Sequence, residues 1–185
     1  MENLLEIYKK LNVLGYTLDP YSQKDETQLY AIFRYVVDTG GQFPYACNSI
    51  EEFHRRFLEA PSNVYVCHSS ADEVVGGFYL KPNFSDKSMP IANAAYMLRS
   101  SSRGQGIGTL LIKASLYLAK DLGFHAMQFN KVFSQNISAI NLYRKLGFNI
   151  IQTLPEAVQN PDGSYQDAYI MYRTLEDFPF SVGSI

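Results

Sequence analysis

The chain has 185 residues, of which 46% are hydrophobic and 18% are charged. This composition is typical of a globular protein that is long enough to bury a core, so we expect a single domain over residues 1–185. Sixteen Lys and Arg against 18 Asp and Glu give a net charge of −2. The balance excludes a global basic surface for nucleic acid or for an anionic membrane.

The chain also lacks the usual signals of export or membrane insertion. No stretch approaches the roughly 20 apolar residues of a membrane-spanning helix, and the start MENLLEIYKK has no signal-peptide pattern. Cys47 and Cys67 form no spacing motif, which favours free thiols in a reducing compartment over a metal site or a disulfide. We therefore expect a cytoplasmic monomer or homodimer without a metal, which binds neither nucleic acid nor membranes.

The first third of the chain is expected to be mainly helical. Residues 2–13 predict a short helix and residues 15–22 a first strand. Residues 25–40 predict a second helix that ends at a glycine pair, and a third should begin at Ser49, because Glu52 completes a capping box. The apolar faces of these last two helices comprise Leu29, Ile32, Phe33, Val36 and Val37, and Ile50, Phe53, Phe57 and Leu58.

The middle of the chain predicts three strands and a long helix. Residues 63–69 and 73–80 are rich in β-formers and indicate a hairpin, and residues 91–98 indicate a third strand. The helix should run from Gly106 to about Leu122. Its apolar face comprises Ile107, Leu110, Leu111, Ala114, Leu118 and Leu122.

The last third adds a strand at 126–133, a helix at 136–147 with an Asn start and a Gly stop, and an antiparallel pair at 149–154 and 167–175. Strands that first pair antiparallel and then flank two helices indicate an α+β fold with a mixed sheet. A doubly wound fold is disfavoured.

The stretch RGQGIG at 103–108 places three glycines at the start of the long helix. It is not a dinucleotide fingerprint, because the third glycine comes one residue early and Thr109 stands in its place. It also lacks the Lys and Ser/Thr of a Walker A loop. Outward backbone N–H groups and the helix dipole would suit an anion, although a tight turn without a ligand is the alternative.

A second motif, NISAINLYRKLGF at 136–148, spaces Asn136 and Tyr143 so that they share a helix face. Together with RGQGIG, it resembles the signature of the GCN5-related N-acetyltransferases (GNAT). The resemblance implies a mostly antiparallel mixed sheet with a splayed central parallel strand pair, here 91–98 and 126–133. It further implies that acetyl-coenzyme A is bound by Met97, Leu98, Arg99, Arg103, Gly104, Gln105, Gly106, Ile107, Gly108, Thr109, Asn136 and Tyr143.

A closer resemblance runs from about Gly41 to Leu175. Segments such as FYLKPNF, IANAAY and MQFNKVFSQNISA are similar to those of the fungal acetyltransferases that act on L-azetidine-2-carboxylate, a proline analogue. This similarity often coincides with ordinary core positions. It favours a small amino acid as acceptor.

Two residues are expected to be catalytic. By the resemblance, Tyr143 donates a proton to the departing thiolate, and a phenol with a pKa of about 10 stays protonated at neutral pH. Asn136 is expected to hydrogen-bond the cofactor arm or the reacting centre. The structural alternatives are packing under the sheet for Tyr143 and simple helix capping for Asn136.

The acceptor site is expected around Asn93 and Asn130, two amides set in apolar strands that should be neighbours. Buried amides need partners, either structural ones or the carboxylate and amine of a small amino acid. Phe43 and Tyr45 could wall an apolar ring, and Lys81 could attract a carboxylate. No general base can be assigned, and His54, His68 and His125 have ordinary explanations.

The sequence thus predicts an N-acetyltransferase that acts on a small-molecule amine. Two alternatives stay open: a protein acetyltransferase acting on lysine or an N-terminus, and an acyl-coenzyme A sensor without turnover. A sensor would have no need for the phenol of Tyr143.

Overall fold

The computed structural model of the protein describes residues 3–39, 43, 46–60, 63–84 and 90–178. The helices are α1 (Leu4–Val13), α2 (Glu26–Asp38), α3 (Ile50–Phe53), α4 (Ile107–Asp121) and α5 (Ile137–Lys145), with the short helical segments η1 (Gln23–Asp25), η2 (His54–Glu59) and η4 (Ser100–Ser102). The strands are β1 (Tyr16–Pro20), β2 (Asn63–Ser69), β3 (Val74–Pro82), β4 (Ile91–Leu98), β5 (Ala126–Phe133), β6 (Asn149–Gln159) and β7 (Tyr165–Thr174).

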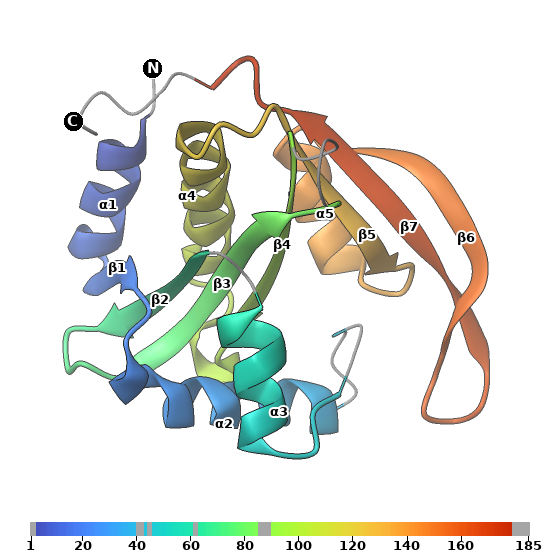
Figure 1. Ribbon diagram of the computed structural model, residues 1–185, viewed down its shortest axis with the longest axis horizontal. Coiled ribbons are helices and arrows are strands. Elements are labelled where there is room, and N and C mark those ends of the chain that lie inside the picture. Colours follow the sequence, from blue (N-terminus) through green and yellow to red (C-terminus); the bar gives the residue numbers. More distant parts are fainter. Residues whose placement is uncertain (1–2, 40–42, 44–45, 61–62, 85–89, 179–185) are drawn as a thin grey trace.

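The seven strands form one sheet in the order β1-β2-β3-β4-β5-β7-β6. Strands β4 and β5 are parallel, and the other five neighbouring pairs are antiparallel. The predicted α+β fold with a central parallel pair is confirmed. The closing pair is longer than expected, because β6 and β7 continue as a twisted hairpin that extends from the body of the molecule (Figure 1).

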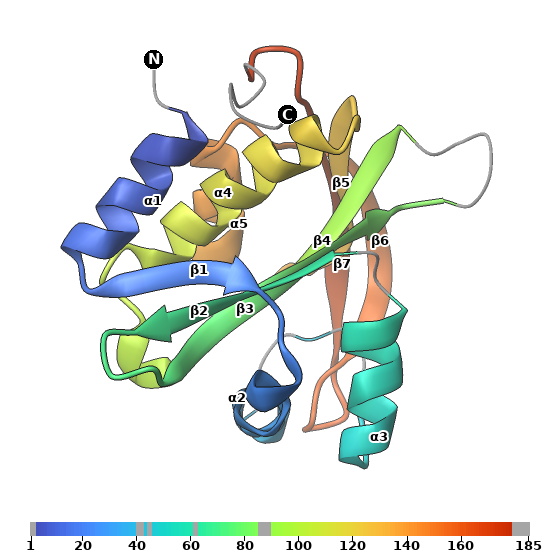
Figure 2. The same cartoon turned by 60° about the vertical axis from the view of Figure 1, so that its left-hand side comes forward.

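Helices cover both faces of the sheet (Figures 1 and 2). On one face, buried side chains of α1, α4 and α5 form a core with β3, β4 and β5. On the other face, α2, α3 and η2 bury a second core that includes Phe33, Phe53 and Phe57. The apolar stripes predicted for α2 and for the helix after Ser49 account for much of this second core.

Helix ends differ from expectation in two places. Ser49 caps α3 by accepting from the Glu52 N–H, but the Glu52 carboxylate accepts from the N–H of Asn48 rather than of Ser49. Leu122, expected on the buried face of the long helix, is 45% exposed. It lies at the C-cap after α4 has ended, where the chain turns away from the core.

The parallel pair separates soon after it forms. β4 pairs with β5 at Ile91–Ala126 and Ala92–Met127, although the two fully described strands run on to Leu98 and Phe133. On its other edge, β5 stays paired with β7 and accommodates one extra residue between Phe129 and Val132. Such a bulge bends a strand. The expected splay between β4 and β5 is therefore present, and it opens at Asn93.

Two further expectations concern single features. Cys47 and Cys67 are buried and unpaired, as free thiols. Among the described residues, no helix has the length and apolar character needed to cross a membrane.

Candidate functional site

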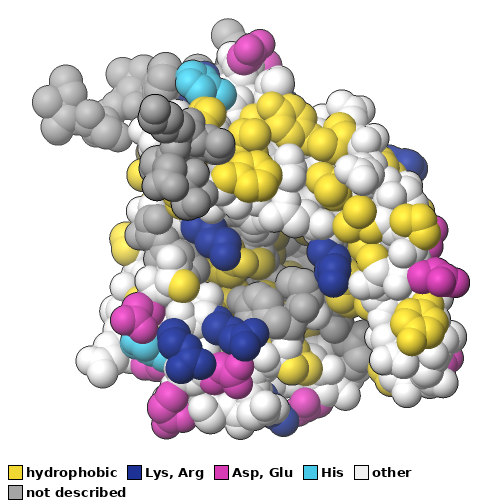
Figure 3. Space-filling model, turned by 45° about the vertical axis from the view of Figure 1, so that its right-hand side comes forward, with side chains coloured by type: hydrophobic (Ala, Val, Ile, Leu, Met, Phe, Trp, Pro, Cys, Tyr) yellow, Lys and Arg dark blue, Asp and Glu magenta, His cyan; other side chains and the backbone are white. Residues whose placement is uncertain are grey.

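A cavity of about 310 Å³ lies where β4 and β5 part. It gathers residues from β3 and the loop that follows it, from β4 and β5, from α5 and its N-cap, and from the segment before α3. They are Phe43, Tyr79, Lys81, Asn83, Asn93, Ala94, Ala95, Tyr96, Phe129, Asn130, Lys131, Val132, Phe133, Asn136 and Tyr143. Figure 3 shows a hollowed face of the molecule with Lys or Arg side chains on both sides of the hollow.

Tyr143 lies on α5 and lines the cavity. Its ring packs against Phe129 at 4.4 Å and against Phe148 at 5.8 Å between centroids, which fixes the side chain under the sheet. Burial raises the pKa of the phenol above its usual value of about 10. The hydroxyl therefore stays protonated over the physiological pH range. Tyr143 thus packs under the sheet, as the structural alternative predicted, and also lines the cavity.

Asn136 is the N-cap of α5, as its position in the sequence predicts. Its Oδ1 accepts from the Ala139 N–H at 3.1 Å and from the Ser138 hydroxyl at 3.1 Å. The same side chain lines the cavity. Because capping occupies the oxygen, the amide nitrogen is the group that Asn136 can offer to a ligand.

Three asparagines meet at the point where the parallel strands part. Asn93 and Asn130 both donate from Nδ2 to Oδ1 of Asn83, at 2.9 and 2.6 Å. Gln128 donates in turn to Oδ1 of Asn130 at 2.8 Å. The sequence predicted that the first two amides are neighbours with partners, and this is confirmed, but only Asn93 is buried as expected, because Asn130 is exposed at the β5 bulge. Their common partner, Asn83, was missed because it lies in the loop after β3, where an Asn is commonplace.

The other expected acceptor residues fall in different places. Phe43 lines the cavity and packs edge-on against Phe33, with centroids 5.1 Å apart. Lys81 also lines it, with Nζ 5.4 Å from the centre of the Tyr79 ring. Tyr45 lies outside the described residues. Lys131, which the sequence did not single out, is exposed at the β5 bulge and lines the same cavity.

The glycine loop presents bare backbone before α4. Gly104 and Gly106 have φ of +77° and +82°, and a Cβ on either would meet no atom within 4 Å. Gly106 is the N-cap and makes no side-chain cap, so the first helical N–H groups are left for a ligand. Gln105 is held aside, since its Oε1 accepts from the Tyr16 hydroxyl at 2.9 Å. These features fit a bound pyrophosphate.

The end of β4 leads from the cavity towards this loop. The N–H of Arg99 donates to the Val75 carbonyl at 2.8 Å, and the Arg99 carbonyl accepts from Ser102. Since polar backbone groups alternate along a strand, the N–H of Leu98 points the other way, towards the gap beside β5. Met97 is buried in the second core. The side chain of Arg99 donates a hydrogen bond to the Val74 carbonyl at 2.8 Å.

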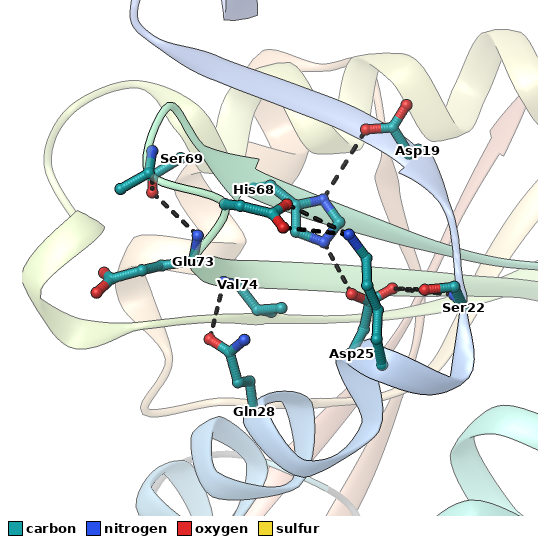
Figure 4. A network of polar contacts seen from close by, with 11 residues as sticks. Asp19, Ser22, Asp25, Gln28, His68, Ser69, Glu73 and Val74 are labelled. Atoms are coloured by element: carbon teal, nitrogen blue, oxygen red, sulfur yellow. Dashed lines mark hydrogen bonds and ion pairs between the residues drawn. The ribbon is translucent and has the colours of Figure 1, made fainter.

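No acidic residue and no histidine is among the described residues that line the cavity. His68 instead contacts Asp25 at 3.0 Å, in a buried polar cluster between β2 and the start of α2 (Figure 4). Desolvation opposes the charge on Asp25, but hydrogen bonds from His68 and Ser22 outweigh it and lower its pKa. His54 pairs with Glu26 at 2.8 Å. These groups lie outside the cavity, so none of the described histidines or carboxylates is placed there as a base.

The sequence of residues 19–148 matches the model of the Acetyltransferase (GNAT) family. The match covers more than half of the chain, and the chain belongs to this family. The motif resemblance seen in the sequence is thereby confirmed at the level of the family.

Individual relatives agree with this assignment. The chain is 37% identical over 109 residues to N-acetyltransferase aca1 of Schizosaccharomyces pombe, covering 56% of this chain and 52% of that one. It is 33% identical over 79 residues to the L-methionine sulfoximine/L-methionine sulfone acetyltransferase of Pseudomonas aeruginosa, covering 43% and 45%. The chain thus spans about half the length of these two relatives. A GCN5-related N-acetyltransferase from Kribbella flavida superimposes with a TM-score of 0.82 at 27% identity, covering 88% of this chain and 99% of that one.

Proposed function

We propose that the protein transfers the acetyl group of acetyl-coenzyme A to the amine of a small molecule. The observation that carries the proposal is the cavity at the opening of the β4–β5 gap, where Tyr143, Asn136 and the asparagine cluster meet. Membership of the GNAT family implies the acetyl donor. Its pyrophosphate would lie on the backbone of residues 103–109, and its pantetheine arm would enter the gap.

The backbone of β4 supplies the hydrogen bond that we propose polarises the thioester carbonyl. The thioester carbonyl would accept a hydrogen bond from the Leu98 N–H, which faces the gap. The same donor would stabilise the oxyanion when the acceptor nitrogen forms its bond to the carbonyl carbon. Met97 and Arg99 flank this position, and Arg103 at the loop provides positive charge near the pyrophosphate.

Proton movement completes the proposed reaction. As the tetrahedral intermediate collapses, the carbon–sulfur bond breaks and the thiolate takes the phenolic proton of Tyr143. The surplus proton on the acylated nitrogen leaves through water and returns the phenol to its neutral form. Because the described residues that line the cavity include no carboxylate or histidine, the acceptor arrives as the neutral amine or loses its proton to water in this proposal.

The size of the cavity supports a small acceptor. About 310 Å³ is at the lower end of small-molecule sites. A relative in Pseudomonas is named for acetylating L-methionine sulfoximine and its sulfone, and the fungal enzymes that the sequence resembles act on a proline analogue. We therefore propose a small amino acid or a proline analogue as acceptor, bound among Asn93, Asn130, Phe43 and Lys81, with Tyr45 as a further wall.

The test is a comparison of acceptors at saturating acetyl-coenzyme A. Release of free thiol is followed with a panel of L-amino acids and proline analogues, and separately with peptides that carry a lysine or a free N-terminus. We expect turnover with at least one amino acid. Acetylation of peptides alone would contradict the proposal, and binding of the cofactor without turnover on any amine would indicate a sensor.

A further inference from the structure

We propose that the acceptor carries an anionic oxygen group, such as a carboxylate, beside its amine, and that Asn83, Lys81 and Lys131 hold this group. The inference rests on the proposed function, to which it adds the residues that bind the anionic group of the acceptor. It is carried by three features of the cavity: its charge, an unpaired buried donor, and the place where the two meet.

The first feature is the sign of the cavity wall. Among the described residues of the wall, the charged ones are Lys81 and Lys131, and the other polar side chains are amides and phenols. Within the described part of the chain, neither lysine is paired with a carboxylate. A wall of this kind attracts an anion and repels a cationic peptide segment.

The second feature is the amide of Asn83. Its Oδ1 already accepts two hydrogen bonds, from Asn93 and Asn130. Its Nδ2 is buried and has no hydrogen-bond partner among the described residues. Buried amide donors are nearly always paired in folded proteins, so an unpaired one on the wall of a cavity indicates an oxygen supplied by a ligand. Asn83 is itself one of the residues that line the cavity.

The third feature is the position of this donor. The Asn83 N–H donates to the Ile91 carbonyl at 2.8 Å, which fixes the residue beside the first paired residues of β4. Lys81, two residues earlier, is opposite Asn93 in the β3–β4 register. The donor therefore lies at the base of the splay with a lysine from β3 nearby, and Lys131 of β5 lines the same cavity. A carboxylate held there leaves the amine of a small acceptor free to face the gap.

The experiment uses matched acceptors that differ only in the anionic group. The first pair is L-azetidine-2-carboxylate and its carboxamide, and the second is L-methionine sulfone and its carboxamide. Asn83→Asp keeps an oxygen for Asn93 and Asn130 but replaces the donor by a negative charge, and the nearby lysines favour its ionised form. Comparing each variant with wild type on the same acceptor cancels the difference in amine basicity.

We expect Asn83→Asp to lower kcat/KM for the carboxylate at least about tenfold more than for the carboxamide, since a lost bond to a charged group has this size. Lys81→Met should shift the ratio in the same direction. Asn149→Asp, on exposed β6, and Lys9→Met, on α1, carry the same changes away from the cavity and should leave the ratio unchanged.

Two outcomes would overturn the inference separately from the function. If wild type acetylates the pairs but Asn83→Asp lowers both members by the same factor, Asn83 only organises the fold and the inference fails alone. The same holds if wild type shows no preference for carboxylate. If wild type acetylates no member of either pair, the small-amino-acid function and the inference fall together.

Discussion

The glycine loop before α4 and the cavity between β4 and β5 are built in opposite ways. The loop is one continuous stretch that offers backbone N–H groups and keeps its side chains out of the way. The cavity takes side chains from three strands, a helix and two loops, and no two of its asparagines are adjacent in the chain. A backbone site tolerates changes in side-chain chemistry but not in conformation, whereas a side-chain site has the reverse sensitivity.

The largest effect should come from breaking the backbone of the loop. Gly106→Val places a β-branched side chain at φ +82°, in a region that such residues avoid at a cost of about 1–3 kcal/mol, and it would occupy space that we propose for the pyrophosphate. We expect affinity for coenzyme A to fall about 100-fold or more, measured by calorimetry.

Gly163→Val is the matched control. Gly163 has φ +86° and equally open surroundings, but it lies in the β6–β7 turn. The Gly163→Val variant should lose about as much stability as Gly106→Val but keep the wild-type affinity for coenzyme A. Unchanged affinity in Gly106→Val would contradict the placement of the pyrophosphate.

A side chain of the cavity should instead affect turnover. Tyr143→Phe removes only the hydroxyl and retains the ring packing on Phe129 and Phe148. We expect kcat to fall by about 10²-fold with an unchanged Kd for coenzyme A, because proton donation contributes a factor of this order. Tyr65→Phe, which removes a hydroxyl in β2 outside the cavity, should be neutral. A preserved kcat would show that water protonates the thiolate.

A substitution in the proposed acceptor site should have a smaller effect, and it should change the KM for the acceptor rather than kcat. Asn130→Ala removes an amide that donates to Asn83 at 2.6 Å and faces the cavity. We expect the KM for the acceptor to rise about ten- to a hundredfold, the size of a hydrogen bond to a charged group, with little change in cofactor affinity. If the side chain is purely structural, the melting temperature falls while this KM stays constant in the folded protein.

The same contrast explains how far the sequence could predict the site. Local sequence patterns predict the order of helices and strands along the chain and the position of the glycine loop. The α+β fold and the place of the loop could therefore be predicted. Asn93 and Asn130 stood out because each is polar within an apolar strand. Asn83 and Lys131 gave no such signal, since polar residues are ordinary in loops and at exposed positions. Only the three-dimensional contact, two amides on one oxygen, identifies Asn83.

The smallest effect concerns the pH dependence of the rate, which distinguishes titration of the Tyr143 phenol from titration of the acceptor amine. Burial raises the pKa of Tyr143, so its neutral form is favoured in the folded state beyond the usual pKa of about 10. The stability linked to this shift is fully present below pH 10 and is lost as the pH rises through the folded-state pKa.

From pH 7 to 10 the rate of acetyl transfer should therefore rise with the neutral fraction of the acceptor amine, without a bend from the phenol. Wild type and Tyr143→Phe should give profiles of the same shape and different height. Above pH 10 the melting temperature of wild type should fall more steeply than that of Tyr143→Phe. A bend near pH 10 in wild type alone would mean that the phenol titrates as if exposed, and that burial does not hold the proton that the thiolate requires.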